Sequence, residues 1–290
     1  MKFVITGASG HLGKLVVSRL LEQVPSSDIG VSVRDPEKAA ALLEKGVRVR
    51  HGDFAAPESL LGAFDQAEKL LIVSPNVVGE KAIQQHRAAI DAASKVGAKH
   101  LFYTSHMGAS STSAFPPMIS HAAAESYLQA SGVPFTALRN GFYAESMMMY
   151  LQEALQTGEL NLPEDGPVAW TTHEDLAEAT AKLMVSGSSL KTAMKLTSPE
   201  VLNFKDIASL VSDITGKSII RTAIPDAKFK EKLEARGVPS LAIPIAMALF
   251  VASRNGEFSG TEDSTLAQVL GRKPLSVLEF LNKKIGPAKS

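Results

Sequence analysis

Apolar runs and amphipathic stretches alternate along the first 140 residues of the chain. The runs are rich in β-branched and aromatic residues, as buried strands are. The stretches between them carry apolar residues at helical spacing. We expect strands at residues 2–6, 28–34, 47–53, 69–75, 99–105 and 134–140, and helices at 11–24, 35–46, 56–66, 80–97 and 118–132. This alternation predicts an α/β fold, in which a doubly wound parallel sheet is covered by helices on both faces.

The alternation loosens after Asn140. The stretch 168–185 predicts a short strand and then a helix. Thr172 is the expected N-cap of this helix, and Asp175 completes a capping-box pattern. These elements indicate a smaller, mostly helical substrate lobe over the C-terminal edge of the sheet, where open α/β sheets bind ligands. We therefore divide the chain into a dinucleotide-binding domain at residues 1–145 and the smaller substrate lobe at residues 146–290. The order of the predicted elements allows the chain to cross between the two lobes more than once. The other elements of the second lobe are expected as helices at 142–155 and 203–216, a strand at 217–224, and mostly helices beyond.

The longest apolar run covers residues 241–253. It is shorter than a membrane span and contains Pro244. It predicts a buried helix, and the candidate roles are a pocket wall or a contact in a homodimer.

Charge and cysteine content exclude several classes of function. The 290 residues carry 30 basic and 30 acidic side chains, without the basic excess that nucleic-acid and anionic membrane surfaces need. The chain has no cysteine, which excludes disulfides, thiolate metal sites and a cysteine nucleophile. We expect no metal and a cytoplasmic location, and no signal peptide because strand-like residues begin at Lys2.

Three glycines separate the first strand from the first helix. Gly7 permits a tight turn, the missing Cβ at Gly10 lets a pyrophosphate approach the backbone, and Gly13 lets the helix pack close to the strand. The helix then presents free N–H groups and its positive end to the phosphates. The pattern predicts a Rossmann-type dinucleotide site, with a purely structural turn as the alternative. Its expected residues are Gly7, Ala8, Ser9, Gly10, His11 and Leu12.

The end of the second strand indicates which dinucleotide binds. An acidic residue there usually binds the ribose 2′-hydroxyl, but this chain has Arg34. A guanidinium can bind a 2′-phosphate through two hydrogen bonds, whereas a carboxylate would repel it. Arg34 therefore favours NADP(H) as the cofactor. Asp35, the next residue, could bind the ribose hydroxyl instead, as in NAD(H) sites. The alternative for Arg34 is a solvated charge at the end of the strand.

Further strand ends should line the same groove, because the carboxyl ends of parallel strands meet at one edge of the sheet. Asp53 has an alternative role as a turn residue that bonds its own backbone. We expect the cofactor groove to be completed by Asp53 and Phe54 beside the adenine, by Ser74, Pro75 and Asn76 beside the nicotinamide ribose, and by Asn140 at the end of the sixth strand.

Five segments, TGASGHLG, VRDPEKA, VRHGD, YTS and GVPFTALRNGFY, are distributed over residues 1 to about 145. With the looser THEDLAEA and LGRKPLSVLEFL, they resemble the NmrA-like group of atypical short-chain dehydrogenases. Within that group the chain is similar to NADPH-dependent quinone oxidoreductases and triphenylmethane reductases. The resemblance implies a Rossmann domain, bound NADPH, and hydride transfer to a quinone or another small, planar, conjugated acceptor.

The chain departs from the family pattern at the catalytic positions. Typical short-chain dehydrogenases carry Tyr-x-x-x-Lys on the helix after the fifth strand. By resemblance to the plant phenylpropanoid reductases, the lysine position falls on His121 and the tyrosine position on Pro117. His121 is thus the candidate catalytic proton donor, with a histidine of no catalytic role as the alternative, and His106 is a weaker candidate.

The missing pair bears on the acceptor. Reducing a ketone makes a strongly basic alkoxide, which needs a proton donor in the transition state. Reducing a quinone makes a phenolate-type anion whose conjugate acid has a pKa of about 10, so water can protonate it. The sequence therefore favours a quinone-like or dye acceptor over a simple ketone.

Aromatic and methionine residues after the sixth strand suit a flat acceptor. Phe142 and Tyr143 are expected to present their rings to the nicotinamide side. Met147, the first of three consecutive methionines, and Trp170 are expected to form the far wall of the substrate pocket. Core packing is the alternative for each of them, and helical spacing allows only one or two of the methionines to face inward.

Two other functions stay open at this point. Some NmrA-like proteins bind the dinucleotide without turnover and act as redox sensors through a protein partner, which the missing Tyr-x-x-x-Lys allows. Against the redox-sensor function, the sequence shows no DNA-binding motif and no basic patch. An epimerase or dehydratase with tightly held NAD is the third possibility, against which Arg34 argues.

Overall fold

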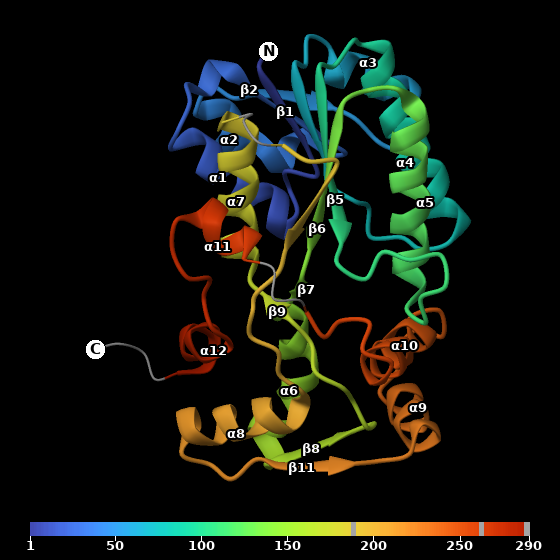
Figure 1. Ribbon diagram of the computed structural model, residues 1–290, viewed down its shortest axis with the longest axis vertical. Helices are drawn as coiled ribbons and strands as arrows, with labels where there is room; N and C mark the ends of the chain where they lie inside the picture. The colour runs from blue at the N-terminus through green and yellow to red at the C-terminus, as the bar shows by residue number, and fades with distance from the viewer. Residues whose placement is uncertain (187–189, 261–263, 287–290) are drawn as a thin grey trace.

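The computed structural model describes residues 1–186, 190–260 and 264–286, and the chain forms two regions that lie one above the other in Figure 1. In the upper region, seven strands of described residues form one parallel sheet in the order β10-β6-β5-β4-β1-β2-β3. The strand order reverses between β1 and β4, which makes a topological switch point. The predicted doubly wound α/β fold is confirmed. The strands are β1 (Phe3–Thr6), β2 (Ile29–Val33), β3 (Arg48–His51), β4 (Lys69–Ile72), β5 (His100–His106), β6 (Phe135–Asn140) and β10 (Ala193–Leu196).

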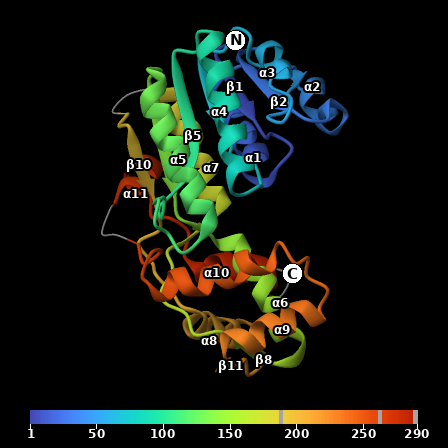
Figure 2. The same cartoon turned by 90° about the vertical axis from the view of Figure 1, so that its right-hand side faces the viewer.

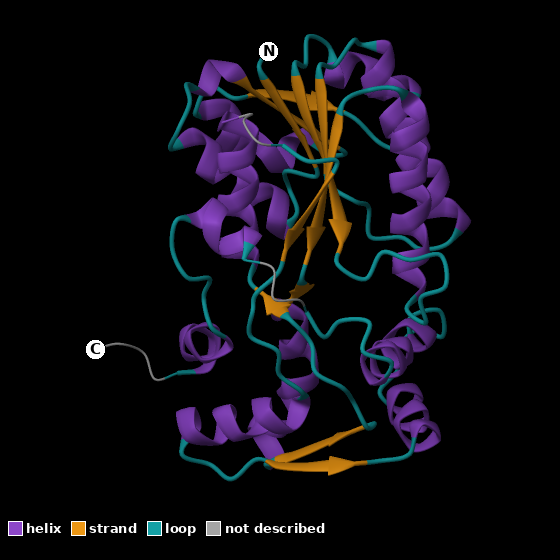
Figure 3. Cartoon of the chain, viewed as in Figure 1, coloured by secondary structure: helices purple, strands orange, loops and turns teal. Residues whose placement is uncertain are grey.

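Helices cover both faces of this sheet, as Figure 3 shows by colour. One face carries α1 (His11–Leu21), α2 (Ala40–Glu44), α7 (His173–Ser186) and α11 (Thr265–Leu270), and the other carries α3 (Glu58–Phe64), α4 (Glu80–Lys95) and α5 (Pro116–Ser131). The helix expected at 35–46 is shorter than predicted, because Pro36–Ala39 form a 3₁₀ turn before α2.

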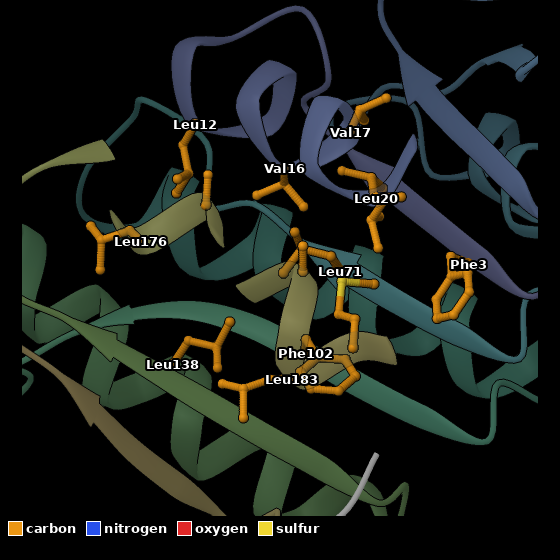
Figure 4. Packing of buried hydrophobic residues seen from close by; sticks show 14 of the residues in the cluster. Phe3, Leu12, Val16, Val17, Leu20, Leu71, Phe102, Leu138, Leu176 and Leu183 are labelled. Carbon is orange, nitrogen blue, oxygen red and sulfur yellow. The ribbon is translucent and has the colours of Figure 1, made fainter. Parts of the chain in front are cut away.

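The apolar residues that predicted α1 form the core under it. Leu12, Val16 and Leu20 of α1 face Leu176 of α7 and Phe102 of the sheet (Figure 4). All five are at most 5% exposed, so they join the two helices to the strands through buried apolar surface. This packing positions the beginning of α1 at the edge of the sheet.

The lower region is mostly helical. Its helices are α6 (Met147–Thr157), α8 (Phe204–Thr215), α9 (Asp226–Ala235), α10 (Ile243–Arg254) and α12 (Val277–Ile285), with two short parallel pairs, β7 (Phe142–Tyr143) with β9 (Trp170–Thr171) and β8 (Glu159–Leu162) with β11 (Ile220–Ala223). Figure 2 shows α10 between the upper region and α9. Among the described helices, none is both long and apolar enough to cross a membrane.

The chain returns to the upper region after residue 146. Strand β10 pairs with β6 at the edge of the sheet, and α7 packs against α1. The chain therefore crosses between the two regions more than once, and residues after 146 contribute to both.

Two local predictions in this part need correction. The helix expected at 142–155 begins only at Met147, because Phe142 and Tyr143 pair with β9 first. The capping box of α7 is half formed: Thr172 Oγ1 accepts the N–H of Asp175 at 3.2 Å. The buried carboxylate of Asp175 instead accepts the N–H of Leu275 at 2.7 Å and pairs with Arg272, which ties the chain after α11 to α7.

Candidate active site

A cavity of about 700 Å³ lies at the carboxyl ends of β1, β2 and β4, where the strand order reverses. Helix α4 closes it with Lys81 and Gln85. Open α/β sheets bind nucleotides at this position. Of the residues expected to hold a cofactor, the cavity is lined by Gly7, Ser9, Gly10, Arg34, Asp53, Phe54, Ser74, Pro75 and Asn76.

The glycine turn has the backbone that its sequence predicts. Gly7 has a φ of +62°, which side chains disfavour. A Cβ on Gly13 would lie 2.4 Å from the carbonyl oxygen of Gly7, so only glycine lets α1 begin this close to the turn. In the described structure no side chain caps the first N–H groups of α1, and its first turn holds no acidic residue. The positive end of the helix is therefore available to an anion.

The two charges at the end of β2 have different environments. Arg34 is exposed, lines the cavity, and has no ion-pair partner in the described part of the chain. Asp35 caps the following turn instead, since its carboxylate accepts the N–H of Glu37 at 3.2 Å and pairs with Lys38 at 3.2 Å. Lys81 adds a second cation to the cavity wall. Its place after the fourth strand is the feature of the sequence that could have identified it.

Ser32 of β2 supplies a further polar group. Its side chain lines the cavity and is 2% exposed, and its Oγ has no hydrogen-bond partner among the described residues. Gly52 follows the last residue of β3, and a Cβ at this position would lie 2.2 Å from Ser32 Oγ. Glycine therefore leaves room for the hydroxyl of Ser32 at this end of the strand. Buried hydroxyls are nearly always bonded, which indicates a ligand or water partner. The turn, this hydroxyl and the two cations fit an anionic dinucleotide that carries an additional phosphate.

Four of the expected cofactor residues, Ala8, His11, Leu12 and Asn140, are not among the residues that line this cavity. Ala8 and Leu12 are buried in the core under α1. His11 is exposed and its ring lies parallel to that of His173, with centroids 6.4 Å apart. Asn140 is fully buried, and its Nδ2 donates to Tyr143 Oη at 3.4 Å. Even Asp53, which lines the cavity, accepts the N–H of its own turn from Ala55 at 2.9 Å, so the turn alternative is realised.

A second cavity of about 800 Å³ adjoins the first, and Asn76 lines both. Phe115 and Phe142 stand at the Asn76 end, with ring centroids 5.7 Å apart. Helices α6, α9 and α10 and strand β8 supply the remaining walls. A ligand that enters beside Asn76 thus meets the dinucleotide groove on one side and apolar rings on the other.

The four residues expected in the substrate pocket separate into two groups. Phe142 lines the second cavity. Met147 and Trp170 are 0% and 1% exposed and pack in the core behind the wall, while Met149, 61% exposed, lines the cavity instead. Tyr143 packs on the ring of His173 at a centroid distance of 4.4 Å. The apolar run at 241–253 was the available signal for the wall that α10 forms.

The candidate catalytic histidine, His121, is half-buried and lines neither cavity, and it belongs to a cluster of rings between the sheet and the helices that cover it. His121 of α5 shares a hydrogen bond of 2.8 Å between its Nδ1 and Tyr103 Oη, and His86 Nε2 of α4 lies 3.4 Å from the same hydroxyl. The ring of His106 is 6.4 Å from that of His121 and 5.4 Å from that of Phe142. The cluster therefore extends from Tyr103 of β5 to Phe142, which lines the second cavity.

Burial determines the protonation of these rings. It lowers the pKa of His121 to about 4, and burial together with the nearby His121 lowers the pKa values of His86 and His106 to about 3. Burial also raises the pKa of Tyr103 far above its usual value, so its hydroxyl keeps its proton. The direction of the Tyr103–His121 hydrogen bond depends on which ring nitrogen carries the proton, and in either tautomer the imidazole of His121 is neutral near pH 7.

No group of three or more acidic or histidine side chains in the described ranges is arranged to hold a metal ion. The polar groups of the two cavities are a helix end, hydroxyls, amides, cations and separate carboxylates.

The fold and the groove define a doubly wound α/β protein with a dinucleotide-type site at its switch point. The model of the NmrA-like family matches residues 1–281, and the chain belongs to this family, as the resemblance of its motifs implied. It is 34% identical over 287 residues to the NmrA-like family domain-containing oxidoreductase flvB of Aspergillus flavus, with 95% of this chain and 92% of that protein covered.

Two bacterial proteins are similar over nearly the whole chain. Quinone oxidoreductase 2 of Escherichia coli is 33% identical over 280 residues, which cover 96% of each protein. The crystal structure of the Citrobacter sp. triphenylmethane reductase complexed with NADP(H) superposes with a TM-score of 0.90 at 31% identity, and covers 98% of this chain and 99% of that one. The fold and the length of the chain are thus those of known reductases.

Proposed function

We propose that this protein is an NADPH-dependent reductase that transfers hydride to a quinone or another planar, conjugated acceptor. The observation that carries the proposal is Asn76, which lines both the dinucleotide groove and the aromatic end of the second cavity. A hydride donor in the first cavity and a flat acceptor in the second would meet there, and such positioning supplies much of the catalysis of hydride transfer.

The charges in the groove support NADPH over NADH. Arg34 and Lys81 line the cavity, and Asp35 is engaged in its own turn. NADPH, when bound, supplies the hydride from its nicotinamide ring. The glycine turn and α1 would hold its pyrophosphate, and Arg34 its 2′-phosphate. The relatives named above include one crystallised with NADP(H).

The residues at the family's catalytic positions support a reaction that needs little acid. Helix α5 carries no lysine, and it has proline at position 117 and His121 in the place of a catalytic pair. His121 is neutral at pH 7, because burial lowers its pKa to about 4. A neutral imidazole is a weak acid that would protonate an alkoxide poorly, whereas water can protonate a phenolate-type product. This favours quinones and cationic dyes over simple ketones.

The proposal is tested by NADPH oxidation, followed by absorbance, against a panel of quinones, cationic dyes and simple ketones. Binding of NADPH is measured separately by its fluorescence. We expect turnover with quinones or dyes and none with ketones. NADPH binding without turnover of any acceptor would contradict the reductase and support the redox-sensor alternative.

A further inference from the structure

The second cavity is much longer than a single acceptor ring. Its wall follows α6 from Ser146 to Glu153 and continues to Glu159, and the 11 residues of α6 span roughly 16 Å. It ends at β8 and α9, which lie away from the large sheet in Figures 1 and 2. A ring held beside Asn76 would leave most of this length unfilled, and ligand cavities normally bury most of their ligand.

The lining changes in character along the cavity. The rings of Phe115 and Phe142 stand at the Asn76 end. Flat rings suit a planar head group there. Farther along, Phe229 is accompanied by mostly aliphatic side chains from β8, α9 and α10 and the segment between the two helices, namely Leu160, Leu162, Leu233, Val238, Ile245 and Leu249. An aliphatic wall of this kind suits a flexible apolar chain.

The charged side chains at the far end already have polar partners. Glu153 pairs with Lys232 at 2.8 Å and with Arg236 at 3.0 Å. Glu159 accepts the side-chain amide of Asn161 at 3.0 Å. A charged extension of the acceptor would have to break these contacts, whereas an apolar one needs no new partner.

We propose that the acceptor carries an apolar chain of the alkyl or isoprenoid type, which extends from the reducible ring beside Asn76 along α6 to the aliphatic end between β8 and α9. This inference rests on the proposed function, because the ring is placed by hydride transfer.

The test is a series of benzoquinones that share one ring and carry no chain, one isoprenoid unit, two units or a decyl chain. We expect kcat/KM to rise along the series, by about tenfold or more from no chain to two units, since each buried methylene improves binding by up to roughly fourfold. A kcat/KM that does not depend on the chain would overturn the inference and leave the reductase intact. Failure to reduce any member would count against the proposed function itself.

Two variants of α10 test where the apolar chain of the acceptor lies. Ala246 lines the cavity, and Ala246→Phe should narrow the kcat/KM ratio between the two-unit and the chainless quinone by about tenfold, because the added ring occupies the path of the chain. The matched control is Met247→Phe at the next residue, which is also half-buried but does not line the cavity, and which should keep the ratio. A ratio unchanged by Ala246→Phe, or narrowed equally by both variants, would refute this path.

Discussion

Tyr103 Oη lies 2.8 Å from Nδ1 of His121 and so links β5 to α5. The same hydroxyl lies 3.4 Å from Nε2 of His86 on α4. One fully buried group thus joins the sheet to α4 and α5, two of the helices on this face.

Replacing this hydroxyl should therefore destabilise the protein. Tyr103→Phe leaves two buried histidine nitrogens without a partner, which we expect to lower the free energy of unfolding by about 1–3 kcal/mol in urea titrations. Tyr127→Phe is the control, because Tyr127 donates to Asp91 at the surface and its loss should cost about 0.5 kcal/mol or less. Equal effects of the two variants would argue against a structural role for the buried cluster.

Arg34→Ala should weaken NADPH much more than NADH. A charge-assisted hydrogen bond contributes about 1.5–3 kcal/mol, so we expect the Kd for NADPH to rise by roughly 10- to 150-fold and that for NADH to change little. Fluorescence titration of both cofactors measures this. Arg50→Ala is the matched control, since Arg50 pairs with Asp65 and lies outside the cavity lining. An equal loss for both cofactors would refute the 2′-phosphate role.

Gly13→Ala should disrupt the glycine turn, because the new Cβ would lie 2.4 Å from the carbonyl oxygen of Gly7. We expect lower stability and loss of NADPH binding, measured by urea unfolding and fluorescence. Gly62→Ala in α3 serves as the control, because a Cβ there has open space, and it should stabilise the protein by about 0.5–1 kcal/mol. Unchanged NADPH binding in Gly13→Ala would show that the turn is not the phosphate site.

Acid should destabilise the fold between pH 6.5 and 4. Burial lowers the folded-state pKa of His121 and His173 to about 4 and that of His86 to about 3, whereas the unfolded chain titrates near 6.5. In this window the unfolded state binds more protons, so stability falls as pH falls, by up to about 1.4 kcal/mol per pH unit for each histidine. Urea titrations at pH 7, 6 and 5 measure the slope, which should be smaller in His86→Gln. A slope of the opposite sign would contradict the buried, neutral state of the cluster.

Short-range rules were enough to predict the sheet, the glycine turn and most of the groove. Gly7, Gly10 and Arg34 lie where the sequence predicts them, because each follows the end of a strand and parallel strands end at one edge. The same rule found Ser74 and Asn76 and missed Lys81, which follows the same strand a few residues later.

Local sequence patterns were sufficient to predict the elements, their alternation and the chemistry at the strand ends, because these depend on neighbours within a few residues. The three-dimensional packing was needed to show that β10 completes the sheet, that Met149 rather than Met147 faces the cavity, and that Asn76 lines both cavities. The rotation of α6 about its axis and the return of the chain to β6 depend on contacts between residues far apart in sequence. Local spacing contains no information about which face of a helix such partners will cover.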